Sequence, residues 1–133
     1  ARRGYSYTRY ADDLTFSGDG HDGVALLLRG VRTVVEEEGF REHPTKTRVM
    51  RAGRRQEVTG VVVNAKTSVA RDEVRALRAI LHNAAKHGLA SQNRGDHPNF
   101  EAHLRGRVAY VTMVDPTRAA ALREQLARAF GER

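Results

Sequence analysis

The sequence contains no cysteine, and it has no apolar run near the ~20 residues that a membrane-spanning helix requires. Without cysteine there is no disulfide framework, no thiolate nucleophile and no zinc-finger spacing. The six histidines also lack the HExxH arrangement of zinc proteases. The N-terminus has no signal-peptide apolar segment, so we expect a cytoplasmic protein without a membrane partner.

What the sequence does contain is an excess of positive charge. The 133 residues are 40% hydrophobic and 29% charged, which suits one globular domain or two small packed subdomains. The formal net charge is +7 and the sequence pI is about 10.5, so a polyanion such as nucleic acid is the first candidate partner. The bases concentrate in residues 65–133, with 12 Lys and Arg against 7 Asp and Glu. The alternative is that these cations only keep the surface soluble.

The first half of the sequence has the pattern of an α+β fold. Aromatic and β-branched residues on both sides of residues 11–13 predict a β-hairpin. Apolar residues recur at helical spacing over 23–38, where Asp22 can cap the helix, Gly39 can end it, and one face can cover a sheet. Two further strand-like segments, joined by AGRR, predict a second hairpin over about 46–63.

The second half changes to a helical pattern. A helix is predicted from Arg71 to the residue before Gly88, and its apolar face is expected to pack on the first half. Beside that face runs a stripe of basic residues, namely Arg71, Arg75, Arg78, His82 and Lys86. This stripe is either a solvated face or a row of cations that follows a phosphate backbone. Two more helices are predicted, one containing residues 100–111 and one starting at Asp115-Pro116.

Two adjacent aspartates stand at the tip of the first hairpin, in the segment YADD (10–13). Adjacent carboxylates repel each other and Asp is rare in strands, so the pair weakens its element unless a cation compensates it. Magnesium prefers oxygen ligands and retains several waters, which makes Asp12 and Asp13 candidate Mg²⁺ ligands. The plain alternative is a polar turn, because Asp is common in turns.

Several motifs, in sequence order, resemble those of reverse transcriptases. The YADD segment resembles their polymerase signature, and GFREHPTKT (39–47) resembles the motif that follows it, with His43 where asparagine is usual. The segment RQEVTGVVVN (55–64) looks like a primer-grip hairpin, and its VTG is the triplet associated with retron enzymes. The segments that resemble the thumb are residues 68–88 and 104–111. The sequence thus resembles retron or closely related bacterial reverse transcriptases, with group II intron-type enzymes as the nearest alternative.

The resemblance implies a fold and an activity. Residues 1–51 would be the C-terminal part of a polymerase palm, residues 52–66 a primer-grip hairpin and residues 67–133 a helical thumb. The parent protein would be an RNA-directed DNA polymerase that uses two Mg²⁺ ions for nucleotidyl transfer. It would extend a DNA primer on an RNA template with deoxynucleoside triphosphates. It would also recognise a cognate structured noncoding RNA and serve antiviral defence.

The resemblance also implies roles for single residues. Asp12 would be the main metal-binding carboxylate, with Asp13 as its less demanding neighbour. Tyr10 would shape the site near the primer end, and Lys46 would approach the triphosphate. By the primer terminus and the cognate RNA would lie Val58, Thr59 and Gly60. The geometry of the basic stripe, apart from the resemblance, predicts that Arg71, Arg75, Arg78 and Lys86 contact phosphates. Ordinary interpretations stay open: that Lys46 is a lysine at a strand edge, and that residues 58–60 are a strand with a small residue at a close contact.

Other classes of protein stay open as well. The family's fingers and first palm aspartate lie upstream of YADD, and only nine residues precede that motif here. We therefore expect an incomplete metal site and a fragment that is inactive alone. A non-catalytic nucleic-acid-binding module would keep the basic stripe but tolerate changes at Asp12. A nucleotide cyclase also pairs acids on a hairpin, but the basic helical half and VTG disfavour it.

Overall fold

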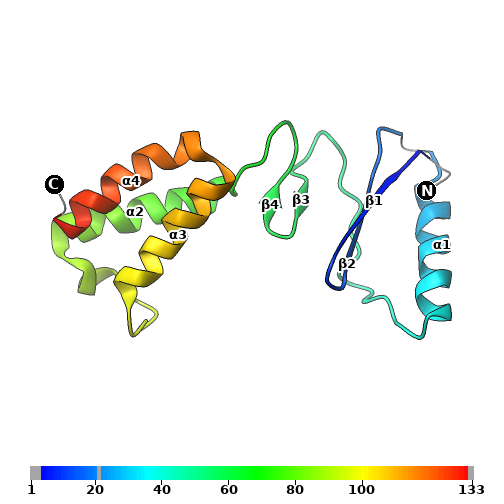
Figure 1. Cartoon of the computed structure of the whole chain (residues 1–133), viewed down its shortest axis with the longest axis horizontal. Coiled ribbons are helices and arrows are strands. Elements are labelled where there is room, and N and C mark those ends of the chain that lie inside the picture. The colour runs from blue at the N-terminus through cyan, green and yellow to red at the C-terminus, as the bar shows by residue number, and fades with distance from the viewer. Residues whose placement is uncertain (1–3, 21, 132–133) are drawn as a thin grey trace. The chain divides into compact units, whose positions relative to one another are not determined.

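The computed structural model describes residues 4–20 and 22–131. These residues form an α+β structure with two small antiparallel sheets and four α-helices, in agreement with the predicted class. The chain divides into two compact units, Ala1–Arg54 and Arg55–Arg133 (Figure 1). The paired aspartates therefore belong to one unit and the basic stripe to the other.

The first unit begins with the predicted hairpin. Strands β1 (Ser6–Tyr10) and β2 (Asp13–Ser17) are antiparallel, and their ends Tyr10 and Asp13 face each other. This register leaves a two-residue turn at positions 11–12, the shortest common hairpin loop. The strands thus hold the two carboxylates of YADD at a tight reversal of the chain.

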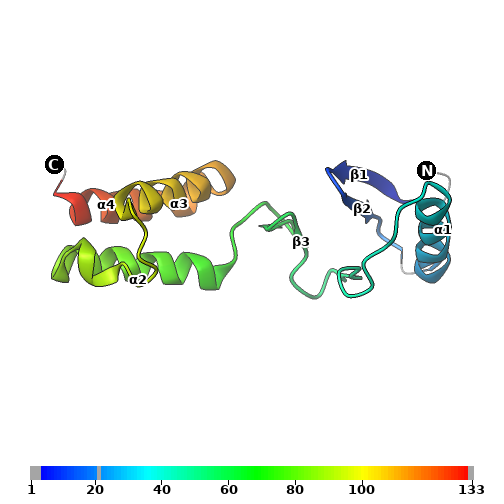
Figure 2. The same cartoon turned by 90° about the horizontal axis from the view of Figure 1, so that it is seen from below.

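Helix α1 (Val24–Glu37) follows the hairpin and confirms the predicted span. Its half-buried residues recur at helical spacing and are Val24, Leu27, Leu28, Val31 and Val35. Figures 1 and 2 show α1 beside the hairpin, but none of its residues is fully buried, so it covers the hairpin only partly. Gly39 ends the helix as predicted. The structure adds that this end is a Schellman motif, in which Gly39 has a φ of 80° and the Phe40 amide donates to the Val35 carbonyl at 2.9 Å.

The start of α1 differs from the prediction that Asp22 caps it. The N-cap is Gly23, with a φ of 85°, and no side chain caps the helix. Asp22 lies one position too early, where its backbone carbonyl accepts the Tyr5 hydroxyl at 3.1 Å. This residue therefore joins the start of β1 to the start of α1 through its backbone rather than capping through its carboxylate.

The prediction of a hairpin over 46–63 is wrong in its first strand. Residues 47–51 form no strand, and β3 (Glu57–Val58) pairs instead with β4 (Val61–Val62). The reason is the turn Thr59–Gly60, in which φ is 48° and then 84°. Two successive positive φ values are typical of tight type I′ hairpin turns. The paired strands therefore reverse inside VTG, whereas the turn at AGRR, closed by the Arg54 amide on the Arg51 carbonyl at 3.0 Å, joins no strands.

The second unit consists mainly of helices, and its three α-helices agree with those predicted. The helices are α2 (Arg71–His87), the short 3₁₀ helix η1 (Leu89–Gln92), α3 (Phe100–Val114) and α4 (Pro116–Phe130). Helix α4 packs against both α2 and α3 (Figures 1 and 2). None of the helices in the described ranges combines the length and apolarity needed to cross a membrane.

The core of the second unit contains the apolar face of α2. Its largest fully buried side chains are Leu77, Leu81, Leu104, Leu122, Val69 and Val111. The expectation that the α2 face packs on the first half of the chain is wrong, because that face shares one buried core with residues of α3 and α4 in the same unit. Burial of this face leaves the opposite side of α2 in solvent.

Candidate functional site

The hairpin tip presents both aspartates to solvent. Asp12 is the second residue of the turn and Asp13 begins β2, and both are exposed. The turn is strained, because Ala11 has a φ of 51°, in the left-handed region that favours glycine. Arg9 supports the turn by donating from Nε to the Ala11 carbonyl at 2.7 Å. Tyr10, which is 72% exposed, adjoins the pair, so three of the predicted site residues lie together.

The two carboxylates are free to bind a cation. Neither makes a hydrogen bond or an ion pair with another residue of the described ranges. Carboxylate oxygens are the ligands that Mg²⁺ prefers, and this ion tolerates water in its remaining positions, so Asp12 and Asp13 fit it. Within residues 4–20 and 22–131, no group of three or more His, Asp or Glu could hold a metal. A further acidic ligand would have to come from outside these residues.

Lys46 lies on a turn after α1, in the same unit as the aspartates. Its amide donates to the His43 carbonyl at 3.0 Å, which closes a β-turn with Pro44 in the second position, where proline is favoured. The Thr45 hydroxyl and His43 Nδ1, 3.2 Å apart, form a second contact within the turn. Lys46 itself is exposed. The strand that was predicted to carry it is therefore replaced by a closed turn that presents its ammonium to solvent.

A polar cluster that the sequence pattern did not reveal joins this turn to α1. Glu42 accepts a hydrogen bond from Arg32 Nε at 2.7 Å and another from the Thr47 hydroxyl. The Arg32 bond, followed by the Thr47 bond, holds the pKa of Glu42 below its ordinary value, and Glu42 in turn raises the pKa of Arg32. Periodicity within α1 cannot reveal such a cluster, because Glu42 lies beyond the end of the helix.

The VTG triplet forms the tip of the second hairpin. Val58 is half-buried, whereas Thr59 and Gly60 are exposed. A φ of 48° is strained for a β-branched residue, and the Thr59 hydroxyl donates to the Val58 carbonyl at 2.8 Å. A Cβ atom added to Gly60 would lie 3.8 Å from the hydroxyl of Tyr110, which places this tip beside α3. The three residues predicted to lie by the primer terminus thus form one reversal of the chain.

The basic stripe is exposed along α2. Its members are Arg71, Arg75, Arg78, His82 and Lys86. The cationic members have no ion-pair partner among the described residues. Because the adjacent apolar face of the helix is buried, these side chains share one solvent-facing side. The structure therefore places them as the phosphate-binding interpretation requires, although a solvated face has the same geometry.

A second polar cluster fixes the chain between β4 and α2. Asp115, which is 4% exposed, accepts the Ser68 hydroxyl at 3.2 Å and caps α4 through the Arg118 amide at 3.1 Å. The Arg118 side chain donates back to Ser68 Oγ at 3.0 Å, and Thr67 donates to the Val114 carbonyl at 3.2 Å. The hydrogen bond from the Arg118 backbone amide is the main cause that lowers the pKa of Asp115. The sequence identified Asp115 as a helix start but not as this junction.

Comparison with known proteins finds relatives that share one class. The retron Mx162 and retron Mx65 reverse transcriptases of Myxococcus xanthus are each 45% identical to the chain, over 94% and 96% of it. The retron Ec86 reverse transcriptase of Escherichia coli is 29% identical over 85% of the chain. No protein-family model matches. The chain spans 28% and 27% of the length of the two Myxococcus relatives.

The chain is therefore homologous to reverse transcriptases. Within that class it is homologous to one segment of the retron enzymes, which confirms the resemblance drawn from its motifs. The homology covers both units, because it extends over nearly all of the chain.

Proposed function

We propose that this chain forms the C-terminal palm and the thumb of a retron-type RNA-directed DNA polymerase. The observation that carries the proposal is the pair of free carboxylates on a strained hairpin tip, in a chain 45% identical to two retron reverse transcriptases. Strained positions within well-formed elements are expected where function requires them. The names of the relatives favour the retron type over the group II intron type. In this assignment, residues 1–51 are palm, 52–66 the primer grip and 67–133 the thumb.

The catalytic roles follow from the hairpin and the Lys46 turn. Asp12 is the main metal ligand and Asp13 the second, and Tyr10 shapes the adjoining surface. Mg²⁺ held there would activate the 3′-hydroxyl of the primer and stabilise the leaving pyrophosphate. The ammonium of Lys46 offsets charge on the incoming deoxynucleoside triphosphate. The exposure of all four side chains supports these roles, since substrate has to reach them.

The nucleic-acid partners are an RNA template and a DNA primer. The cations at positions 71, 75, 78 and 86 bind phosphates, and because no described anion pairs with them, no internal ion pair competes with that binding. Val58, Thr59 and Gly60 lie by the primer terminus, and they contribute to recognition of a cognate structured noncoding RNA. The strain at Thr59 supports a role at this tip beyond folding.

Primer extension on an RNA template, by the whole protein with Mg²⁺, tests the proposal through Asp12→Asn. A neutral amide cannot replace a carboxylate that binds two metal ions, so we expect polymerisation to fall to background while the protein stays folded. Asp19→Asn, at an exposed aspartate outside the hairpin tip, is the matched control and should extend normally. Near-normal incorporation by folded Asp12→Asn would remove Asp12 from catalysis and favour a non-catalytic nucleic-acid-binding module.

The isolated chain should not polymerise. It spans 27–28% of the length of its two Myxococcus relatives, and no third acidic ligand joins the pair within the described ranges. We therefore expect no nucleotide incorporation by purified residues 1–133. Template-dependent extension by this chain, free of contaminating polymerase, would contradict that expectation.

A further inference from the structure

The turn that carries Lys46 has both of its flanks joined through one carboxylate. Residues 43–46 form the turn, Glu42 precedes it and Thr47 follows it. Glu42 Oε1 accepts the hydroxyl hydrogen bond of Thr47. The turn is therefore closed twice. The Lys46 amide closes it through its hydrogen bond to the His43 carbonyl, and the contact of Glu42 with Thr47 joins its two flanks.

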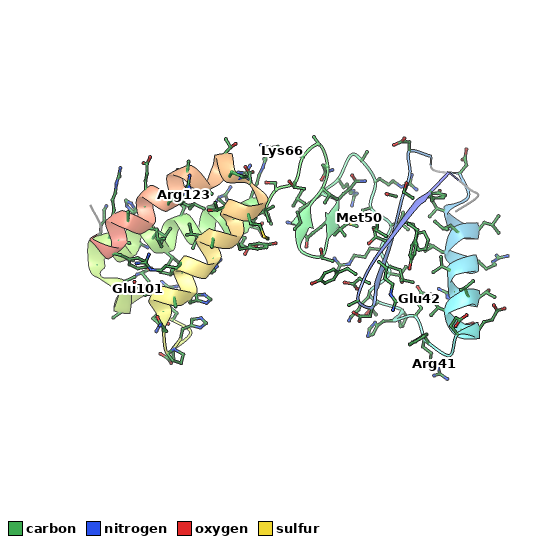
Figure 3. The ribbon with its side chains drawn as sticks, in the orientation of Figure 1. Arg41, Glu42, Met50, Lys66, Glu101 and Arg123 are labelled. Atoms are coloured by element: carbon green, nitrogen blue, oxygen red, sulfur yellow. The ribbon has the colours of Figure 1, made fainter. Side chains whose placement is uncertain are left out.

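The same carboxylate anchors the turn to α1. Glu42 Oε2 accepts Arg32 Nε at 2.7 Å, which connects positions ten residues apart across the end of the helix. The Glu42 side chain is 22% exposed, against 58% for that of Arg32. Figure 3 shows Glu42 on the segment that follows α1, while its neighbour Arg41 extends away from the ribbon. Both oxygens of Glu42 are therefore engaged, one toward the helix and one toward the turn.

Stability alone does not account for this cluster. Solvent screens an ion pair with an exposed arginine, and such pairs contribute little to folding. The segment from Phe40 to Thr47 has no helix or strand of its own, so the bonds of Glu42 restrict its conformation. The pKa of Glu42 is lowered first by Arg32 and then by Thr47, so the carboxylate stays charged, and these bonds stay in place, to a lower pH than for an ordinary glutamate.

We propose that Arg32, Glu42 and Thr47 are positioning residues that hold the Lys46 turn in the geometry required by an incoming nucleoside triphosphate. This inference rests on the proposed function, and it assigns the three residues an action through Lys46 rather than on the triphosphate. Without the cluster the turn samples conformations that place the ammonium away from the phosphates. Triphosphate binding is then weakened more than the chemical step is slowed, because the free-energy cost is that of ordering the turn when the triphosphate binds.

Single-nucleotide incorporation by the whole protein, with KM for the deoxynucleoside triphosphate and kcat measured separately, tests the proposal. Glu42→Gln should raise KM about fivefold with a smaller change in kcat. Thr47→Val removes one bond and should shift KM in the same direction, whereas Thr47→Ser keeps the hydroxyl and should retain the normal KM. Glu37→Gln, at an exposed carboxylate of α1, is the matched control and should change neither constant.

A Lys46→Ala background separates positioning from a general structural role. There, Glu42→Gln should raise KM no further, because the group that it positions is gone. An equal effect of Glu42→Gln with and without Lys46 would overturn the inference, and so would a loss of kcat alone accompanied by a lower melting temperature. The proposed function is judged independently, by whether Asp12→Asn abolishes polymerisation.

Discussion

Replacing Thr59 with glycine should stabilise the hairpin of β3 and β4. Its φ of 48° strains a β-branched residue at a cost of about 1–3 kcal/mol. Glycine adopts this φ freely, but it loses about 0.5–1 kcal/mol in chain entropy on folding. The substitution also removes the 2.8 Å bond from the Thr59 hydroxyl to the Val58 carbonyl, which contributes about 0.5 kcal/mol at an exposed site. The expected net gain is about 1 kcal/mol.

Hydrogen exchange at the Val63 amide measures this gain. That amide donates to the Gln56 carbonyl at 2.9 Å, at the open end of the hairpin, so it exchanges when the hairpin opens. A gain of about 1 kcal/mol should slow exchange about fivefold in Thr59→Gly. Thr59→Val keeps the branched side chain without the hydroxyl, and it should exchange faster than the natural protein. Faster exchange in Thr59→Gly would refute the reasoning, because the threonine contacts would then outweigh the strain.

The remaining predictions concern the helical unit. Replacing Arg75 and Arg78 together with alanine should weaken template–primer binding equally for all sequences, and it should lower the slope of log affinity against log salt by about two. Arg123→Ala, at an exposed arginine of α4 (Figure 3), is the control. An unchanged slope in the double variant would mean that the stripe is only a solvated face. Because the pKa of Asp115 lies below its ordinary 3.8, its ionised form stabilises the unit above that pH, and this contribution is lost as the pH falls through the lowered pKa. Asp115→Asn keeps a capping side chain without the charge. Urea unfolding measured against pH should therefore show a lower free energy of unfolding at neutral pH and a smaller loss of it as the pH falls. An unchanged pH profile would exclude a stabilising role for the Asp115 charge.

Sequence patterns were sufficient where the partners of a residue lie close to it along the chain. The spans of α2 and α4 follow from apolar periodicity together with Gly88 and Asp115-Pro116 at their ends, and these signals act within a turn of helix. The first hairpin was predictable for the same reason, since its loop has only two residues. The motifs then identified Asp12 and Asp13, because a motif is recognised from residue types and their spacing along the chain, which do not depend on the fold.

The errors have physical causes that act over longer distances or depend on backbone angles. The segment 47–51 has strand-forming residues, but its expected partner instead folds back on itself at Thr59–Gly60. A threonine at positive φ is too rare for composition to predict. The bonds of Glu42 to Arg32 and of Asp115 to Ser68 join positions on different elements, and only the folded chain brings them together.

The two hairpin tips share a feature that explains how the molecule combines strain with stability. Each carries a non-glycine residue at positive φ, Ala11 in YADD and Thr59 in VTG. No described residue of the first unit is fully buried, so its hairpin tip has no apolar core to support it. Local hydrogen bonds, such as that of Arg9 to the Ala11 carbonyl, support the tip instead. The second tip belongs to the unit that contains α2, α3 and α4, whose apolar faces and helix ends agree with their local sequence. Two of the three described non-glycine residues at positive φ thus lie in the motifs, and the third, Asp96, is of a type that tolerates this region. The apolar core, in contrast, lies in helices whose local sequence favours them.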